Sequence, residues 1–429
     1  MAEAGKAPTA RRLFWPVYLL LLLGLALLGT EVVASFVVPS YPARELRPIP
    51  ADLLQRNLAE AFADRPDLIP VFNDWALRDR PRSFARPADV RFRSVLVGDS
   101  FLEGFFVRAP LSAFVEQRWT VAGHTGMEAI NFGVSATGPR QYYYRIRDIA
   151  LALKPDALLL AVYAGNDFIP TPFGGNVLPP FIAELPIPSL LGSVAPRTTW
   201  LTVNRLGLSE VGSGNRGIPG ELATLNGYLR LPADERLDRL VGHMKEHYFP
   251  RLSHDTIREI LARSGDRFWA AFDKRQNDPE FLAGWLLSGM IDWETGTWKM
   301  PRDAEEADRL EGTRLVDETL SWLVAADRLA KEAGVPLLIA LLPVGTVDRN
   351  YVDFWRPWPK YFSGSLGADA RHGRLAVALR QTGLAFIDLR DDLAGVAGTY
   401  RLSDGHWTER GTEIVANRMA RELLKLRRN

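Results

Sequence analysis

The chain has 429 residues, 47% of them hydrophobic, which is enough for one large domain or two with a substantial core. A formal net charge of +1 argues against a nucleic-acid-binding protein, because such proteins carry a basic stripe. The absence of cysteine excludes disulfides, thiolate catalysis and zinc sites with cysteine ligands.

The amino-terminal segment has the pattern of a membrane anchor. Residues 1–12 are basic, and residues 13–38 are apolar apart from a few positions such as Glu31. About 20 apolar residues suffice to cross a hydrocarbon core, and the basic flank predicts a cytoplasmic amino terminus. We therefore expect a single-pass inner-membrane helix over 13–38, with the rest of the chain periplasmic or otherwise extracytoplasmic. The alternative is a cleaved signal peptide with its apolar region at 17–28, a reading that Glu31 favours.

Residues 39–90 are rich in proline and arginine. They contain one short amphipathic helical pattern, at residues 51–63. We expect a linker whose role is to hold the following domain away from the membrane.

Five short aliphatic runs alternate with helical patterns between residue 91 and the carboxyl terminus. Each has the composition of a strand buried on both faces, and helical crossovers between such strands produce a parallel sheet. The runs are Val95–Val97, Glu128–Gly133, Ala157–Tyr163, Val335–Leu342 and Leu384–Asp388. The alternation predicts a doubly wound α/β domain over residues 91–429.

Residues 168–308 interrupt this alternation, so we expect a largely helical insert that caps the active site. Two motifs lie within it. Gly212–Gly217 matches a dinucleotide-binding glycine pattern, but no strand precedes it and no helix follows, so we interpret it as a loop. His243-Met-Lys-Glu246-His247 matches the inverted zinc-hydrolase pattern. The alternative is a solvated helix face, and we favour that reading, so no metal is predicted.

Polar residues at the predicted turns could serve one reaction. Ser100 follows the first strand, at the edge where α/β sheets bind ligands, and it becomes a nucleophile only if a base takes its proton. His406 is the candidate base, because Asp404 two residues earlier can accept from its Nδ1–H and hold the tautomer. The Ser100 amide, Gly133 and Asn166 could donate to a tetrahedral oxyanion.

Four of these blocks resemble those of the SGNH (GDSL-type) hydrolases, in the usual chain order: Gly98-Asp-Ser100, Asn131-Phe-Gly133, Gly165-Asn166-Asp167 and Asp404-Gly-His406. The resemblance, which is to a membrane-anchored bacterial member, covers residues 92–167 and 335–424. It implies a flavodoxin-like three-layer α/β/α sandwich with a five-stranded parallel sheet, which cleaves or transfers acyl esters without metal or organic cofactor. It also implies Ser100 as nucleophile, His406 as base with Asp404 as its partner, and Ser100, Gly133 and Asn166 as the oxyanion hole.

The last block departs from the family pattern. The usual spacing is Asp-x-x-His, whereas Asp404 and His406 are separated by one residue and Trp407 follows. Similar Asp-x-His-Trp blocks occur in SGNH-like proteins that O-acetylate bacterial exopolysaccharides. Those proteins place the block before their serine, so the chain order here favours the hydrolase branch.

The leading expectation is therefore an extracytoplasmic ester hydrolase that removes acetyl or other short acyl groups from a glycan. The aromatic loop over residues 351–362 motivates the glycan, because aromatic faces pack on sugar rings, although the same residues could serve as core packing. An O-acetyltransferase that receives acyl groups from a membrane partner is the alternative, since only the attacking hydroxyl differs. A third hypothesis is a catalytically inactive binding or assembly subunit, against which the intact Ser100, His406 and Asn166 argue.

Overall fold

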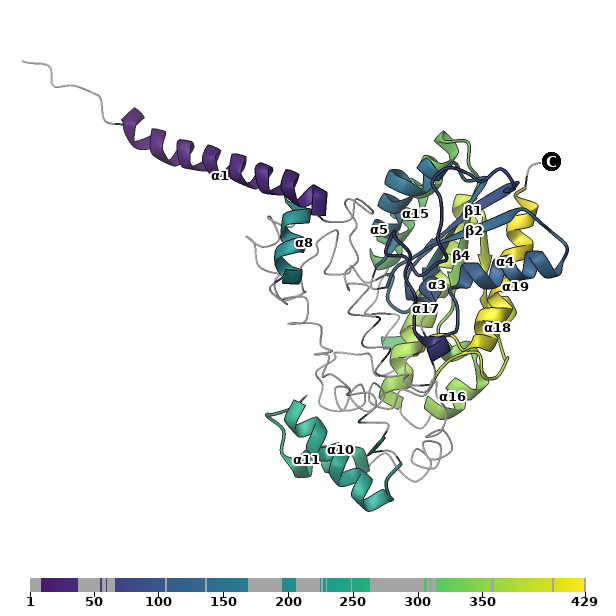
Figure 1. Cartoon of the computed structure of the whole chain (residues 1–429). Helices are drawn as coiled ribbons and strands as arrows, with labels where there is room; N and C mark the ends of the chain where they lie inside the picture. Colours follow the sequence, from purple (N-terminus) through teal and green to yellow (C-terminus); the bar gives the residue numbers. More distant parts are fainter. Residues whose placement is uncertain are drawn as a thin grey trace, which may run out of the picture. The chain divides into compact units, whose positions relative to one another are not determined.

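The computed structural model describes residues 9–37, 66–168 without 105 and 136, 195–205, 230–262 without 248, 314–355 and 359–427 without 403 and 404, with a few single residues between these ranges. The chain divides into two compact units (Figure 1). One contains residues 1–48 and 172–216, and the other contains residues 49–171 and 217–429.

The larger unit is built on a five-stranded parallel sheet with the strand order β2-β1-β3-β4-β5. The strands are β1 (Phe92–Gly98), β2 (Met127–Gly133), β3 (Ala157–Tyr163), β4 (Leu337–Leu342) and β5 (Phe386–Asp388). All residues of β1 and β4 are buried, which is why these strands read as continuous aliphatic runs. The order is that of flavodoxin-like folds, whose ligand crevice opens where the winding direction switches, between β1 and β3.

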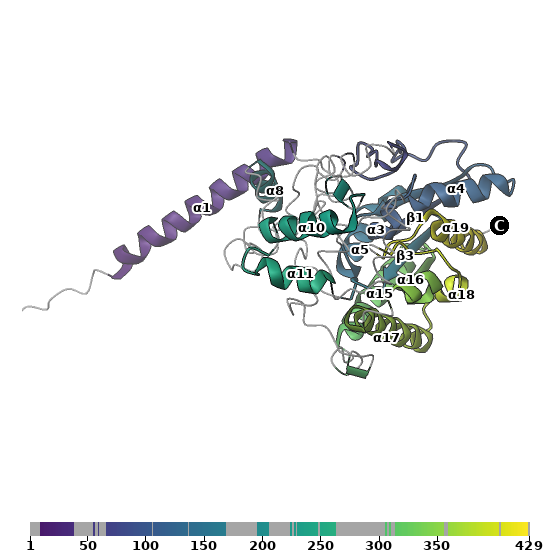
Figure 2. The same ribbon diagram turned by 90° about the horizontal axis from the view of Figure 1, so that it is seen from below.

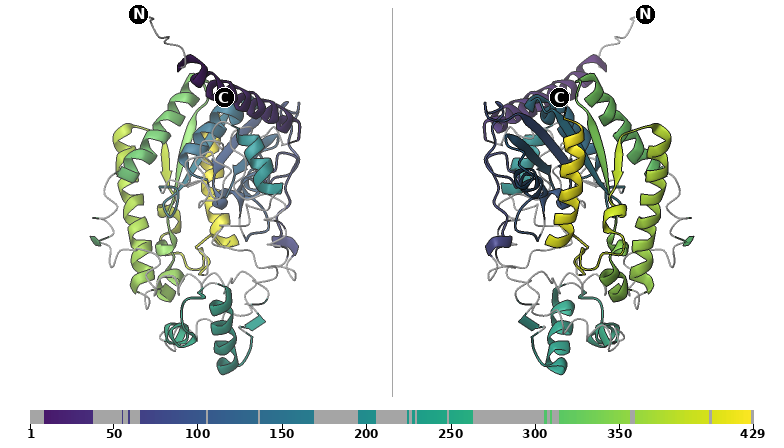
Figure 3. Two further views of the ribbon diagram at one scale, coloured as in Figure 1. Left: turned by 90° about the vertical axis from the view of Figure 1, so that its left-hand side faces the viewer. Right: turned by 90° about the vertical axis from the view of Figure 1, so that its right-hand side faces the viewer.

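Two helical layers cover this sheet. α4 (Leu111–Val121) and α19 (Glu409–Lys425) pack together on one face, while α5 (Pro139–Arg145), α15 (Arg314–Glu332) and α17 (Pro359–Thr382) cover the other (Figure 3). Right-handed crossovers dictate this division, because the chain moves to one side from β1 to β2 and to the other side for every later strand. The predicted three-layer α/β/α sandwich with five parallel strands is confirmed.

Shorter helices connect the main elements. They are α3 (Ser100–Glu103), α16 (Arg349–Trp355) and α18 (Arg390–Leu393), with α10 (Ala233–His247) and α11 (His254–Ala262) in the insert. α10 and α11 pack side by side through buried apolar residues (Figure 2). The prediction of a loop over residues 348–364 is wrong. Helix α16 forms there because the Asp348 carboxylate accepts a hydrogen bond from the Asn350 amide (2.7 Å) at the start of the helix.

The smaller unit contains α1 (Thr9–Val37) and α8 (Pro196–Arg205). Trp15–Ala34 of α1 is long and apolar enough to cross a membrane, a property that export signals share. Glu31 in this helix is not isolated, because its two carboxylate oxygens accept from the amides of Arg197 (3.0 Å) and Thr198 (2.9 Å) in the first turn of α8. A carboxylate is favourable at the amino terminus of a helix, where the first amides lack intrahelical acceptors.

We expect Glu31→Ala to weaken the contact between α1 and α8. Hydrogen bonds to a charged group contribute about 1.5–3 kcal/mol each, so the population of the docked state should fall at least tenfold. The chain has no cysteine, so Ala34→Cys combined with Thr199→Cys, two buried positions of this unit, can be joined by a short bis-maleimide in detergent.

The expected result is efficient cross-linking in the otherwise native chain and little in the Glu31→Ala background. Ala34→Cys paired with the exposed position Thr202→Cys serves as the control for reagent reach. Equal cross-linking with and without Glu31 would contradict the proposed capping contact.

Candidate active site

Ser100 and His406 meet at the carboxyl edge of the sheet. Ser100 is the first residue of α3, which begins directly after β1, and its side chain is buried. His406 lies 306 positions further along the chain, yet its Nε2 is 2.8 Å from Ser100 Oγ. This is the distance at which an imidazole can accept the proton of a serine hydroxyl.

The local sequence explains why Ser100 is held at this edge. Asp99 precedes the helix, and its Oδ1 accepts from the Phe101 amide at 3.0 Å. Gly104 ends the helix in the left-handed region (φ 80°) and returns its N–H to the Ser100 carbonyl. Ser100 is therefore at the first helical position, where a backbone N–H has no intrahelical acceptor and could donate to an oxyanion.

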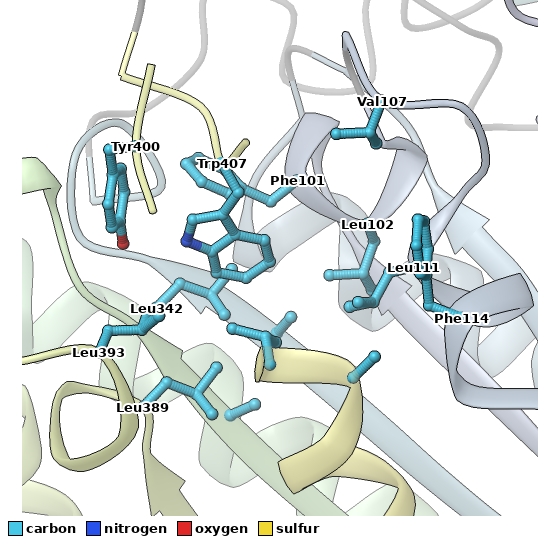
Figure 4. Packing of buried hydrophobic residues seen from close by; sticks show 14 of the residues in the cluster. Phe101, Leu102, Val107, Leu111, Phe114, Leu342, Leu389, Leu393, Tyr400 and Trp407 are labelled. Atoms are coloured by element: carbon cyan, nitrogen blue, oxygen red, sulfur yellow. The ribbon is translucent and has the colours of Figure 1, made fainter. Parts of the chain in front are cut away.

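Aromatic rings hold the His406 imidazole. It stacks on Phe101 with ring centroids 4.8 Å apart and an interplanar angle of 30°, and it meets Phe106 edge-on at 5.8 Å. Trp407 packs against the other ring edge of this group, 4.7 Å from Phe101 (Figure 4). These contacts fix the plane of the base and surround it with apolar surface.

Asp404, the predicted partner of His406, lies outside the described residues, so its role stays a prediction. The hairpin around it is described. Tyr400 and Trp407 form an antiparallel bridge, and Arg401 donates its amide to the His406 carbonyl at 2.8 Å. His406 is thus presented from a narrow, hydrogen-bonded turn that precedes α19.

Gly133 lies at the end of β2, next to α3, but its amide has a different use from the one predicted. Its N–H donates to the side-chain oxygen of Asn131 at 2.9 Å, and the next amide, that of Val134, donates to Gly98 in β1. Amides in a strand alternate in direction, so the Gly133 N–H is directed to the outer side of β2, away from β1. Its role in an oxyanion hole stays a prediction, and it would require the bond to Asn131 to break.

A glycine is required at this position for another reason. A Cβ on Gly133 would lie 2.3 Å from the Glu103 amide nitrogen and 2.7 Å from the Leu102 carbonyl carbon, both in the backbone of α3. The end of β2 therefore touches the helix that carries Ser100. This contact depends on the fold and is invisible in the sequence.

Asn166 is exposed in the turn that follows β3. β1 and β3 are paired neighbours, so this turn and Ser100 leave the sheet at the same edge. Asp167 braces the turn by accepting from the Tyr163 amide (2.8 Å) and the Tyr142 hydroxyl (2.9 Å). Arg371 of α17 donates to the Gly165 carbonyl at 3.2 Å. The side-chain amide of Asn166 is a suitable oxyanion donor, and that role stays a prediction.

Buried carboxyl groups lie directly behind the nucleophile, a feature that sequence reasoning missed. Burial raises the pKa of Asp99 to about 6, an effect that the bond from the Phe101 amide and the neighbouring His406 only partly offset. Burial and then the charge of Asp99 raise the pKa of Asp167 well above its usual range. Glu103 is also buried and accepts from the Ser135 amide at 2.8 Å. Only the tertiary contacts show that these acids form one group.

We expect Asp99→Asn to stabilise the protein at neutral and alkaline pH. The folded-state pKa of about 6 exceeds the ordinary value of 3.8, so the carboxyl contributes stability that is present at acidic pH and lost as the pH rises through about 6. This difference corresponds to ~3 kcal/mol. The asparagine amide is uncharged and still caps a helix.

Thermal unfolding of the full-length protein in detergent tests this expectation. The variant should unfold at a higher temperature than the wild type near pH 8, and this advantage should shrink toward about pH 4. An advantage that is the same at both pH values would show that the charge of Asp99 has no such effect.

The histidine motif of the insert does not form a metal site within the described part of the chain. The rings of His243 and His247 lie 4.5 Å apart on α10, but no group of three or more histidine or acidic residues suited to a metal occurs among the described residues.

No family model and no curated protein matches the chain. Two solved structures are similar to it. One is a GDSL-like lipase from Bacteroides thetaiotaomicron, at 10% identity and a TM-score of 0.34, with 80% of this chain and 92% of that chain covered. The other is named for acylhydrolase activity and comes from Bacteroides fragilis, at 12% identity and a TM-score of 0.34, with 80% and 93% covered. Similarity at this level carries no argument about function, which must come from the site itself.

Proposed function

We propose that this protein is a serine ester hydrolase that passes an acyl group through Ser100. The observation that carries the proposal is the 2.8 Å contact between Ser100 Oγ and His406 Nε2 at the ligand-binding edge of the sheet. The imidazole takes the hydroxyl proton as Oγ attacks the ester carbonyl. It then returns the proton to the leaving alcohol, and water releases the acyl group by the same two steps in reverse.

The developing oxyanion needs donors, and we assign the Ser100 amide and the Asn166 side chain to it. Both leave the carboxyl ends of neighbouring strands, β1 and β3. Asp404 is proposed to orient His406 through Nδ1, as the sequence spacing suggests. Neither a metal nor an organic cofactor is needed for this chemistry, because a base and preorganised donors supply the proton transfer and charge stabilisation.

We further propose that the enzyme is anchored by α1 in the inner membrane and acts outside the cytoplasm on acetyl or short acyl esters of a glycan. The apolar span with its basic flank supports the anchor. The aromatic segment supports the glycan less than its sequence suggested, because Tyr351, Phe354 and Trp355 are buried. The glycan therefore rests on the sequence blocks shared with carbohydrate O-acetylation proteins.

Covalent labelling with a fluorophosphonate, followed by peptide mapping, tests the proposal. The expected product is modified at Ser100, and Ser100→Ala should abolish both this labelling and the hydrolysis of p-nitrophenyl acetate. Ser94→Ala is the matched control, because Ser94 is a buried serine of β1 that bonds only to the Glu128 carbonyl. A folded wild type that is neither labelled nor active would instead favour a binding or assembly subunit.

The O-acetyltransferase alternative shares every residue of this site, with an acyl donor supplied by a membrane partner. It differs in the group that attacks the acyl-serine. Adding acceptor oligosaccharides to the labelled-acyl enzyme and examining the products by mass spectrometry distinguishes the two. Acetylated oligosaccharide indicates a transferase, and free acetate alone indicates a hydrolase.

A further inference from the structure

We infer that the segment leaving β4, residues 343–355, is a positioning platform for His406, and that the buried carboxylate of Asp348 is its central element. The inference rests on the proposed function only for its kinetic readout. The contacts that support it do not depend on the reaction.

The hairpin that carries His406 is not part of the sheet. It begins near Gly398 and returns at Thr408, where the Thr408 amide donates to the Thr399 carbonyl at 3.0 Å and the Thr408 hydroxyl donates to the Gly398 carbonyl at 2.7 Å. These bonds close the hairpin on itself. They do not determine where its tip, with His406, stands relative to Ser100, so an external attachment is needed.

Asp348 provides that attachment. Its side chain has no solvent exposure. One carboxylate oxygen accepts from the Gly398 amide at 3.0 Å. The other accepts from the Thr399 amide at 2.6 Å, the Tyr400 amide at 2.8 Å and the Thr399 hydroxyl at 3.2 Å. Three successive backbone amides of the hairpin thus converge on one buried carboxylate, and such charge-assisted bonds are the stronger kind.

Two aromatic side chains add further contacts between the platform and the hairpin. The indole of Trp355 donates to the Leu402 carbonyl at 3.2 Å, and the hydroxyl of Tyr400 donates to the Pro343 carbonyl. Both rings are buried. Together with Asp348, these bonds hold the hairpin from Gly398 to Leu402, on the strand of the hairpin that leads to His406.

The platform also connects the base to the strand that carries the nucleophile. Pro343 directly follows β4, β4 pairs with β3 along six residues, and β3 pairs with β1, which ends at Ser100. The distance between the two reacting groups is therefore set through the sheet and Asp348. A misplacement of about 1 Å can cost on the order of 10²-fold in rate.

Isosteric variants test the inference in the full-length protein. Asp348→Asn keeps the shape but replaces one acceptor oxygen with an NH₂ group that faces backbone donors, so kcat for p-nitrophenyl acetate should fall about 10²-fold. KM should not change, because no substrate contact is removed. Tyr400→Phe and Trp355→Phe each remove one hydrogen bond and keep the ring, and smaller losses of kcat are expected. These two variants decide the question if Asp348→Asn fails to fold.

Asp156→Asn is the matched control. Asp156 also accepts a backbone amide, that of Arg93 at 2.7 Å, but at the amino end of β1, opposite the site. It should lower the unfolding temperature and leave kcat unchanged. The inference is overturned if Asp348→Asn retains wild-type kcat, or if Asp156→Asn loses as much kcat as Asp348→Asn does.

A second readout does not require activity. The chain has six histidines, so selective ¹³C labelling allows the His406 ring resonance to be assigned by difference with His406→Gln. Asp348→Asn should shift or broaden this resonance, whereas Asp156→Asn should not. If the wild type proves inactive, the proposed function fails and this measurement still decides on the platform. An unchanged resonance in Asp348→Asn overturns it.

Discussion

Replacing His406 with alanine is expected to lower the rate of Ser100 acylation on the order of 10⁴-fold or more, since nucleophile and base act as a unit. The 2.8 Å contact makes His406 Nε2 the acceptor for the Ser100 proton. Without it the hydroxyl must attack while still protonated, because a free serine is a weak nucleophile at neutral pH. The rate of fluorophosphonate labelling, measured under pseudo-first-order conditions, reports this step directly.

The control for this experiment is His247→Ala. His247 belongs to the zinc-like motif on α10 and contacts His243, so its removal tests the competing chemistry with the same substitution. We expect the labelling rate of this variant to equal that of the wild type. A His406→Ala protein that is folded and still labels at more than about a tenth of the wild-type rate would exclude His406 as the base.

Substituting Gly133 with alanine is expected to reduce both stability and activity, although the substitution keeps the backbone N–H. The added Cβ would lie 2.3 Å from the Glu103 amide nitrogen and 2.6 Å from Leu102 Cβ. The nearest obstacle is backbone, so α3 must move, and overpacking of this kind costs about 3 kcal/mol. Because α3 carries Ser100, the labelling rate should fall about 10²-fold.

Gly242→Ala is the matched control, because a Cβ at this helical position meets nothing within 4 Å. It should leave labelling unchanged and should not lower the unfolding temperature, since alanine favours a helix over glycine. If Gly133→Ala instead retains full stability and activity, then the close contact between β2 and α3 is not what this glycine provides.

The aromatic segment illustrates a limit of sequence reasoning. Residues 351–362 were expected to form a loop, with a sugar-binding surface as one reading. In the structure Trp355 is buried and bonds to the Leu402 carbonyl, within the hairpin that carries His406. Composition reveals that a segment is aromatic, but an aromatic side chain suits both a core and a ligand surface. Its neighbours decide between them, and those neighbours are distant in the chain.

The buried acids illustrate the same limit. Asp99 and Asp167 both stand next to predicted site residues, so the sequence marks their positions. Their raised pKa values come from desolvation and from one another. Desolvation is a property of the packed protein and has no local sequence signal.

What the sequence determined by itself was the parallel sheet and the candidate nucleophile and base. A strand buried on both faces must be continuously apolar, and a reactive polar residue at its end therefore stands out, as Ser100 does after β1. Only the tertiary structure brought His406 to Ser100, engaged the Gly133 amide with Asn131 and assigned Asp348 to the hairpin. Those outcomes depend on which segments meet across hundreds of residues, and contacts of that range are chosen by the packing of the whole domain.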